Sequence, residues 1–362
     1  MRFASSEVWT QTTIGKIAQV IGGGTPETDN VNYWNGGIQW FTPSEVGQSK
    51  YIEKSERTIS IEGLSKSSAK LLPVGTLLLS TRATVGECSI ALNECSTNQG
   101  FQSLIASDKV NNEFLYYLIA TKKRHFVKYA CGSTFLEISN KEVAKTKIFV
   151  PQQREQEKIA TFLSKIDQRI ETQSKIIEKL QSQIIAISNI MVKAISQKIS
   201  LGEICVFERK TAHQSSEGLS NGTYPFFTNE EETVKFFNSY DFNGEYIIAN
   251  TGGKANFKYY NGKFAAMSDC LIIKIKDASL TKFYSIVFSN LQKYIDYVGF
   301  EGSGLKHLNK DWLLKLQVPQ YGSEAETFIK IINNLKEKLQ KEKDILSLYK
   351  KQKAYLLSNM FI

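Results

Sequence analysis

Polar and basic side chains gather in glycine-rich loops of this sequence, in a pattern suited to binding an anionic partner. A guanidinium such as that of Arg82 can fork onto a guanine, and the side chain of Asn98 or Gln99 can bracket an adenine edge. Glycine beside them lets the backbone approach a phosphate. In the first half of the chain the candidate DNA contacts are Thr25, Trp40, Thr42, Ser80, Arg82, Thr84, Asn98 and Gln99. In the second half they are Arg209, Lys210, Thr228, Asn229, Asn250, Thr251, Lys254, Ser268, Lys306 and His307.

Each of these residues, taken singly, is also typical of a simple turn, and Trp40 is equally typical of a core. Because single-residue predictions succeed rarely, we expect roughly a third of these residues to touch DNA.

Recognisable catalytic patterns are missing. Gly253 and Lys254 are followed by Ala255, so they form no P-loop. No two prolines adjoin, which excludes the Asn/Asp-Pro-Pro-aromatic motif of amino-methyltransferases. The histidines stand apart at His125, His213 and His307. Since lone histidines are more often structural than metal-binding, we expect no catalytic residue, no metal site and no cofactor bound by this chain.

Composition describes a folded, basic protein. Hydrophobic residues make up 42% and aromatic residues 11% of 362 positions, enough for two domains with their own cores. The formal net charge of +9 favours an anionic partner such as nucleic acid. The five cysteines are widely spaced and include no C-x-x-C pair, so we expect reduced thiols and a cytoplasmic location. No apolar run is long enough to span a membrane.

Short motifs recur at a spacing of roughly 170 residues, which indicates an internal repeat. GTLLLSTRATVGE from Gly75 resembles GEYIIANTGGKAN from Gly244. A V-P-Q join before a helical segment occurs twice, with Pro151 and Pro319 at its centre. Proline cannot donate to a sheet ladder or continue an upstream helix. We therefore predict that each proline ends the last strand of a globular domain and leads the chain into a helix.

The fold class predicted is α+β: two similar domains, mainly β with short helices, joined by two long helices that form an antiparallel coiled coil. TLLLST, YIIANT and CLIIKIK are β-branched or aliphatic runs bounded by turn residues. NEFLYYLIATKKRHFVKYA and TKFYSIVFSNLQKYIDYV carry helical apolar patterns. The predicted boundaries are 1–150 for the first domain, 151–198 for the first long helix, 199–318 for the second domain and 319–362 for the second long helix.

Apolar residues repeat every seven positions along both long helices, as in the a and d positions of a coiled coil. The predicted pairing residues are Leu163, Ile170, Gln173, Ile177, Leu180, Ile184, Ile332, Leu335, Leu339, Glu342, Leu346 and Tyr349. Gln173 and Glu342 are polar at matching d positions, so we expect either a central polar layer that sets the register or two side chains that reach solvent. Chain order favours antiparallel pairing, because the second domain must connect the end of one helix to the start of the other. At 1.5 Å per residue the first helix should span roughly 65 Å, as a spacer would.

The whole chain resembles the specificity subunit of type I restriction–modification enzymes. The residues that carry this resemblance lie at Gly22–Val46, Ser67–Glu87, Ser96–Leu104, Tyr224–Asn229, Tyr246–Ile272 and the two V-P-Q joins. The resemblance implies two target recognition domains, each reading one half of a bipartite asymmetric site in double-stranded DNA, and spacer helices that set the gap. It also implies two methyltransferase subunits docked on the helical regions, and restriction/translocase subunits in the full complex. S-adenosylmethionine, ATP and Mg²⁺ would then belong to the partners, as would adenine flipping and N6 methylation.

Two other classes of protein stay open from the residues alone. A stand-alone DNA methyltransferase or nuclease would need a catalytic motif within this chain. A coiled-coil protein adaptor would bind DNA without a steep dependence on salt.

Overall fold

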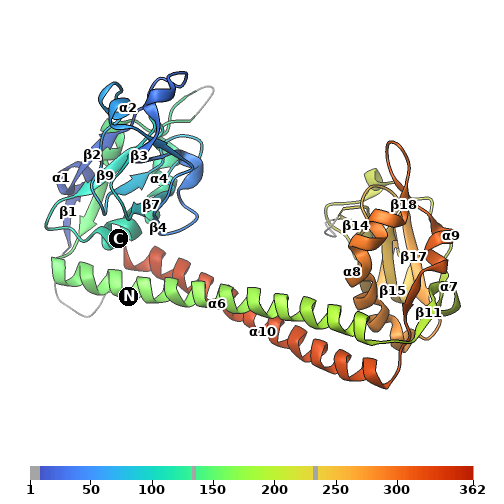
Figure 1. The fold of residues 1–362 in the computed structure, drawn as a ribbon. Helices are drawn as coiled ribbons and strands as arrows, with labels where there is room; N and C mark the ends of the chain where they lie inside the picture. Colours follow the sequence, from blue (N-terminus) through green and yellow to red (C-terminus); the bar gives the residue numbers. More distant parts are fainter. Residues whose placement is uncertain (1–8, 133–135, 231–234, 362) are drawn as a thin grey trace. The chain divides into compact units, whose positions relative to one another are not determined.

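The protein consists of two compact units, shown in Figure 1 as a computed structural model that describes residues 9–132, 136–230 and 235–361. Unit 1 comprises the described residues up to Gln173 and from Ile345 onward, and unit 2 comprises Ser174–Asp344. Both units combine β-sheets with short helices, and two long helices run through both of them. The predicted α+β class is confirmed.

Unit 1 contains a five-stranded sheet in the order β2-β9-β6-β7-β4 and a three-stranded sheet in the order β5-β3-β8. The strands are β2 (Ala18–Gly22), β3 (Trp34–Phe41), β4 (Tyr51–Ile52), β5 (Arg57–Ile59), β6 (Leu77–Leu79), β7 (Cys88–Ala91), β8 (Cys95–Thr97) and β9 (Gln102–Ala106). The short helices are α1 (Ile14–Ile17), α2 (Ile61–Ser65), α3 (Asn112–Thr121), α4 (Lys123–Tyr129) and α5 (Asn140–Lys145), with 3-10 turns η1 (Val31–Tyr33) and η2 (Pro43–Glu45).

The apolar run at β6 is buried on both faces of its sheet. Alternate side chains of a strand point to opposite faces, so Leu77 and Leu79 join the core that includes α3, while Leu78 joins a second core with Phe41 and Phe101. A strand buried on both sides reads in the sequence as a continuous apolar run, as TLLLST does.

Unit 2 contains a six-stranded sheet in the order β12-β17-β15-β16-β13-β14 and the two-stranded pair β18-β19. The strands are β12 (Cys205–Phe207), β13 (Tyr224–Phe227), β14 (Lys235–Phe237), β15 (Phe242–Asn250), β16 (Phe257–Ala266), β17 (Cys270–Ile275), β18 (Phe300–Glu301) and β19 (His307–Leu308). The short helices are α7 (Leu201–Ile204), α8 (Thr281–Val298) and α9 (Lys310–Lys315), with 3-10 turns η3 (Ser215–Glu217) and η4 (Ala278–Leu280). Helix α8 confirms the helical pattern predicted from TKFYSIVFSNLQKYIDYV.

A two-stranded antiparallel ladder joins the beginning and the end of each globular part. In unit 1, β1 (Thr10–Thr13) pairs with β10 (Lys147–Val150), and in unit 2, β11 (Lys198–Ser200) pairs with β20 (Gln317–Pro319). The two V-P-Q joins are not equivalent in these ladders. Pro151 follows β10, whereas Pro319 is itself the last residue of β20 and lies opposite Lys198. A proline is tolerated there because it occupies the end of a short edge pair.

The two long helices are α6 (Gln153–Ala194) and α10 (Ser323–Met360), and they run antiparallel. In unit 1 the C-terminal part of α10 packs against the N-terminal part of α6, where Leu356 and Met360 share one apolar core with Ile159 and Leu163. In unit 2 the opposite ends meet, since Met191 of α6 shares a core with Ala325 and Ile332 of α10. The antiparallel direction predicted from chain order is therefore confirmed within each unit.

The side chains at the heptad positions predicted for helix pairing are buried or half-buried. Leu163 and Ile332 are fully buried, and Ile177, Leu180 and Gln173 are at most 8% exposed. The other predicted pairing residues are half-buried, namely Ile170, Ile184, Leu335, Leu339, Glu342, Leu346 and Tyr349. The predicted pairing of Gln173 with Glu342 stays a prediction.

The compact units cut across the domain boundaries expected from the sequence. The long helices occupy 153–194 and 323–360, within the predicted segments 151–198 and 319–362. Each compact unit, however, includes half of each helix in addition to its globular part. The reason is that the apolar cores continue from the sheets and short helices onto the long helices, so no solvated linker separates them.

Polar contacts add to the apolar attachment of the first globular part to both helices. The Lys50 ammonium donates to Ser164 Oγ of α6 at 2.7 Å, and the Tyr117 hydroxyl donates to Asp167 Oδ2 at 2.6 Å. Asp167 also forms an ion pair with Lys353 of α10, at 2.5 Å. Burial and the bond to Asp167 raise the pKa of Tyr117, so its hydroxyl keeps the proton that it donates. One carboxylate thus links the globular part, α6 and α10.

Removing a core side chain from α6 should destabilise unit 1. Leu163 is fully buried, so Leu163→Ala should lower the free energy of unfolding by about 2–5 kcal/mol through lost burial and the cavity left behind. Ile185→Ala is the matched control, because Ile185 lies on the same helix and is 62% exposed. Urea unfolding monitored by circular dichroism measures both; equal shifts of the midpoint would contradict the packing described.

Candidate nucleic-acid interface

Backbone hydrogen bonds tie the candidate loops of unit 1 into one surface. The amide of Asn98 donates to the carbonyl of Phe41 at 3.1 Å, which joins the loop after β8 to the loop after β3. The amide of Thr81 donates to Gly100 O at 2.8 Å, and the amide of Ile138 donates to Thr81 O at 3.3 Å. Loops that are distant in the sequence are therefore held side by side by bonds that do not depend on side-chain identity.

Unit 2 repeats this network with different side chains. The amide of Met267 donates to Phe227 O, the amide of Thr251 donates to Asp269 O, and the amide of Leu308 donates to Thr251 O, each at 2.9 Å. Taken in the order just given, each of these three bonds in unit 2 corresponds to one of the three bonds described for unit 1. The two halves of the chain thus build the same loop scaffold twice.

On the scaffold of unit 1, several candidates contact each other. Thr25 Oγ1 donates to Gln99 Oε1 at 2.5 Å, and Thr84 Oγ1 donates to Pro43 O at 3.0 Å. The exposed Arg82 guanidinium forms an ion pair with Glu137 at 2.8 Å. Thr25, Arg82, Thr84 and Gln99 are half-buried or exposed, so their side chains remain candidates for contacting DNA.

Other candidates of unit 1 are used within the domain. Trp40 is 4% exposed and its Nε1 donates to Gly24 O at 2.9 Å. Ser80 is fully buried, and Thr42 caps η2 by a reciprocal exchange of hydrogen bonds with Glu45. Asn98 Oδ1 accepts from the amide of Gly100 at 2.8 Å. Trp40 and Ser80 are buried and shape the loops, whereas contact of Thr42 and Asn98 with DNA stays a prediction beside their roles in their own turns.

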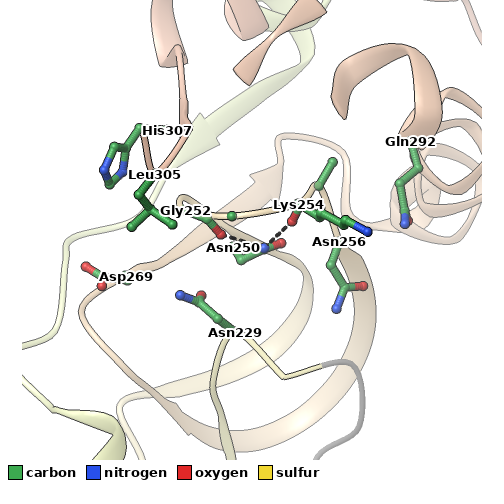
Figure 2. A pocket seen from close by; sticks show the side chains of 11 residues that line it. Asn229, Asn250, Gly252, Lys254, Asn256, Asp269, Gln292, Leu305 and His307 are labelled. Carbon is green, nitrogen blue, oxygen red and sulfur yellow. Dashed lines mark hydrogen bonds between the residues drawn. The ribbon is translucent and has the colours of Figure 1, made fainter. Parts of the chain in front are cut away.

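In unit 2 the loop scaffold surrounds a cleft of about 690 Å³ (Figure 2). Four predicted candidates line it: Asn229, Asn250, Lys254 and His307. The remaining lining residues are Gly252, Gly253, Ala255, Asn256, Asp269, Gln292 and Leu305. The structure therefore brings together candidates that lie up to 78 positions apart in the sequence.

Asn250 shapes the loop at the floor of the cleft. Its Nδ2 donates to Gly252 O at 3.0 Å and also to Lys254 O, as the dashed lines in Figure 2 show. These two bonds fix which end of the amide is the donor, so Oδ1 is the acceptor. Asn250 is 7% exposed, and Oδ1 is buried with no hydrogen bond among the described residues.

The other candidates of unit 2 lie beside this cleft or elsewhere on the unit. Lys306, Arg209 and Lys210 are exposed, and Ser268 is half-buried. Thr228 is buried and accepts from the amide of Glu230, and Thr251 Oγ1 donates to Asp269 O at 2.8 Å. We therefore expect Thr228 and Thr251 to hold their loops, whereas the exposed cations are free to meet phosphate.

The sequence analysis missed four residues that line the cleft: Asn256, Asp269, Gln292 and Leu305. Asp269 follows the candidate Ser268, and Asn256 lies within the repeated segment that starts at Gly244. Their inclusion in these repeated segments could have identified both. Gln292 lies on α8, where its polar neighbours are those of any solvated helix face, so no sequence signal marked it.

Two kinds of group that often serve catalysis, metal-ligand clusters and reactive thiols, can be checked directly in the described residues. No three His, Cys, Asp or Glu side chains among those residues are placed to hold a metal ion. Burial raises the pKa of Cys88 and of Cys95 to about 12, so these thiols stay protonated. No helix within the described ranges is long and apolar enough to cross a membrane.

A family model described as the type I restriction modification DNA specificity domain matches residues 6–182 and 196–351. The two matched segments correspond to the two halves of the internal repeat. Together they cover most of the 362 residues.

Curated relatives match about half of the chain. The type I restriction enzyme MjaIX specificity subunit of Methanocaldococcus jannaschii is 39% identical over 179 residues, which are 48% of this chain and 41% of the relative. The type I restriction enzyme EcoR124I/EcoR124II specificity subunit of Escherichia coli is 27% identical over 162 residues, 43% of this chain and 40% of the relative. The matched part spans about two fifths of the length of these relatives.

Solved structures share the fold over nearly the entire chain. A type I restriction-modification system S subunit from M. genitalium superposes with a TM-score of 0.61 at 18% identity, covering 100% of this chain and 98% of the other. A chain from work on complex assembly and conformational transition of the type I R-M system gives 0.64 at 12% identity, covering 97% of each. At these identities the likeness concerns the fold alone.

A methyl group added to one loop glycine of unit 1 should disturb the interface. A Cβ at Gly23 would lie 2.1 Å from Asn98 O and 2.3 Å from Thr97 Oγ1, so Gly23→Ala must push the two loops apart. We expect a loss of about 1–3 kcal/mol in stability, measured by thermal unfolding. Gly37→Ala is the control, since nothing lies within 4 Å of its Cβ. An equally small effect of both changes would contradict the close approach of these loops.

Proposed function

Because this chain belongs to the family of type I restriction modification DNA specificity domains, we propose that it is the DNA-recognition subunit of a type I restriction–modification complex. Each unit reads one half of a bipartite, asymmetric site in double-stranded DNA. The observation that carries this proposal is the loop scaffold built twice from the same backbone hydrogen bonds and bearing different side chains. Two loop scaffolds with the same backbone bonds but different side chains suit the recognition of two different base sequences. The net charge of +9 favours binding to DNA.

The long helices serve as the spacer between the half-sites. α6 has 42 residues and α10 has 38, so each spans on the order of 60 Å. Each helix contributes to the apolar cores of both units, so the two units are connected by continuous helices. Major-groove sites recur every 34 Å or so along DNA, and in this proposal the length of the helices sets the separation of the half-sites.

Catalysis belongs to partner subunits in this proposal. Two methyltransferase subunits dock on the helical regions, and restriction/translocase subunits complete the complex in the cytoplasm. S-adenosylmethionine, ATP and Mg²⁺ are bound by those partners, which also flip and methylate the target adenine. The similarity to the specificity subunits of the MjaIX and EcoR124I/EcoR124II type I enzymes supports this division of labour.

The full chain should bind duplex DNA in a manner that weakens steeply with salt, because bound lysine and arginine side chains release counterions. Replacing Lys254 and Lys306 together by Gln should reduce the slope of log K against log salt by about 2. Lys341 and Lys343, exposed on α10, give the matched control pair. Fluorescence anisotropy measures the slopes. Salt-independent binding would favour a protein adaptor, and methyl transfer by the pure chain from labelled S-adenosylmethionine would favour a stand-alone enzyme.

Exchanging residues 1–150 for the equivalent segment of a relative should change one half of the recognised sequence only. The reason is that, among the described residues, the backbone bonds between the loops of unit 1 involve only residues from the first half of the chain. Mapping of methylated adenines in cells that express either chain with its partner subunits gives both half-sites. A change in both halves at once would refute the modular reading.

A further inference from the structure

The cleft of unit 2 is lined by amide and carboxylate side chains from separate segments of the chain. Asn229 follows β13, Asn256 precedes β16, Asp269 precedes β17 and Gln292 lies on α8, all arranged around loop 250–256 in Figure 2. None of these four side chains forms a hydrogen bond with another residue that the structure describes. Polar side chains that line one cleft without bonding to each other can form hydrogen bonds with a ligand.

At the corresponding place unit 1 carries an ion pair. An isolated β-bridge joins Arg82 to Glu137 in unit 1 and Gly252 to His307 in unit 2, beside equivalent backbone bonds. The Arg82 and Glu137 side chains form an ion pair across this bridge. At Gly252 the side chain is missing, and a Cβ there would lie 3.7 Å from the His307 imidazole. Gly252, which lines the cleft of unit 2, thus stands where unit 1 has an arginine engaged in an ion pair.

An acceptor without a donor lies at the floor of this cleft. Asn250 Oδ1 is buried and unbonded among the described residues, while Nδ2 of the same amide is held by two carbonyls. A buried acceptor left without a donor destabilises the protein. A ligand that brings N–H donors as loop 250–254 adjusts would satisfy this acceptor.

The carboxylate of Asp269 indicates which chemical groups the ligand must carry. A carboxylate that faces phosphate is repelled, so an exposed aspartate on a DNA-binding surface weakens non-specific attraction. It is useful there only as an acceptor, and the donors that DNA offers in the major groove are the amino groups of cytosine N4 and adenine N6. Lys254 also lines this cleft, so the cleft offers a cation to the phosphates beside its acceptors.

We propose that unit 2 reads amino-bearing bases in the major groove through this cleft, and that Asp269 is a specificity-determining residue that accepts from a cytosine. Asn229, Asn256 and Gln292 supply amides of the kind that bond bidentately to adenine N6 and N7. The half-site of unit 2 therefore contains a cytosine with adenine nearby. This inference rests on the proposed function and adds the chemistry of one of its two readers.

Asp269→Asn in the full chain tests the proposal by selection from a library of randomised DNA duplexes. The amide keeps the shape of the side chain, while it exchanges a pure acceptor for a group that suits adenine. We expect one position of one half-site to change from cytosine towards adenine, with discrimination at that position reduced about ten- to a hundred-fold. Affinity for duplexes without the site should stay equal or rise, because a negative charge has been removed. A merely structural role for Asp269 would weaken binding without changing the preferred base.

Two further variants keep the test decisive. Gly252→Ala adds a Cβ in ordinary contact distance of His307 without a strained backbone, so the chain should fold and bind its unit 2 half-site about ten-fold more weakly. Asp311→Asn removes an exposed carboxylate from the first turn of α9, outside the cleft, and should leave the selected sequences unchanged. Unchanged base preference in Asp269→Asn would overturn the assignment of Asp269, with the proposed function intact. If the unaltered chain selects no sequence at all, the proposed function fails as well.

Discussion

The antiparallel packing of α6 against α10 is the interaction on which the rest of this structure depends. Each helix contributes one half of its apolar stripe to the core of unit 1 and the other half to the core of unit 2. Leu163 and Leu356 belong to the first core, and Met191 and Ile332 belong to the second. In unit 1, Asp167 adds a polar link, since it bonds Tyr117 of the globular part and Lys353 of α10. Because each helix belongs to these cores, a change in helix packing also acts on the cores of the globular parts.

The repeated loop scaffold explains how one architecture can carry two different binding surfaces. Backbone amides and carbonyls hold the loops in both units, so the side chains at their tips can vary without loss of the scaffold. The bridge of Arg82 with Glu137 and the bridge of Gly252 with His307 illustrate this variation. The side chains of the first pair form an ion pair, whereas the residues of the second pair line a cleft. Buried Trp40 and Ser80 belong to the scaffold, although their residue types alone suggested contact with DNA.

Most of the fold could be predicted, because periodic apolar patterns report burial directly. The runs at Leu77–Leu79 and Cys270–Ile275 became strands that are largely buried, and the heptads of α6 and α10 became stripes of buried and half-buried residues. The positions of the two V-P-Q motifs were read as equivalent, whereas the strand ladders place Pro319 inside its strand and Pro151 after it. Sequence similarity cannot reveal register, since register depends on hydrogen bonds with the partner strands at Thr10 and Lys198.

The sequence by itself determined the repeat, the α+β class, the direction of helix pairing and the family. These follow from order along the chain and from apolar spacing, which survive without knowledge of any contact. Only the tertiary structure decided which polar residues share a surface. Asn229, Asn256, Asp269 and Gln292 come from different segments and meet only because backbone bonds and a core bring those segments together. A polar residue in a loop has no periodic pattern to reveal whether it holds its own turn, as Asn98 does, or faces an open cleft.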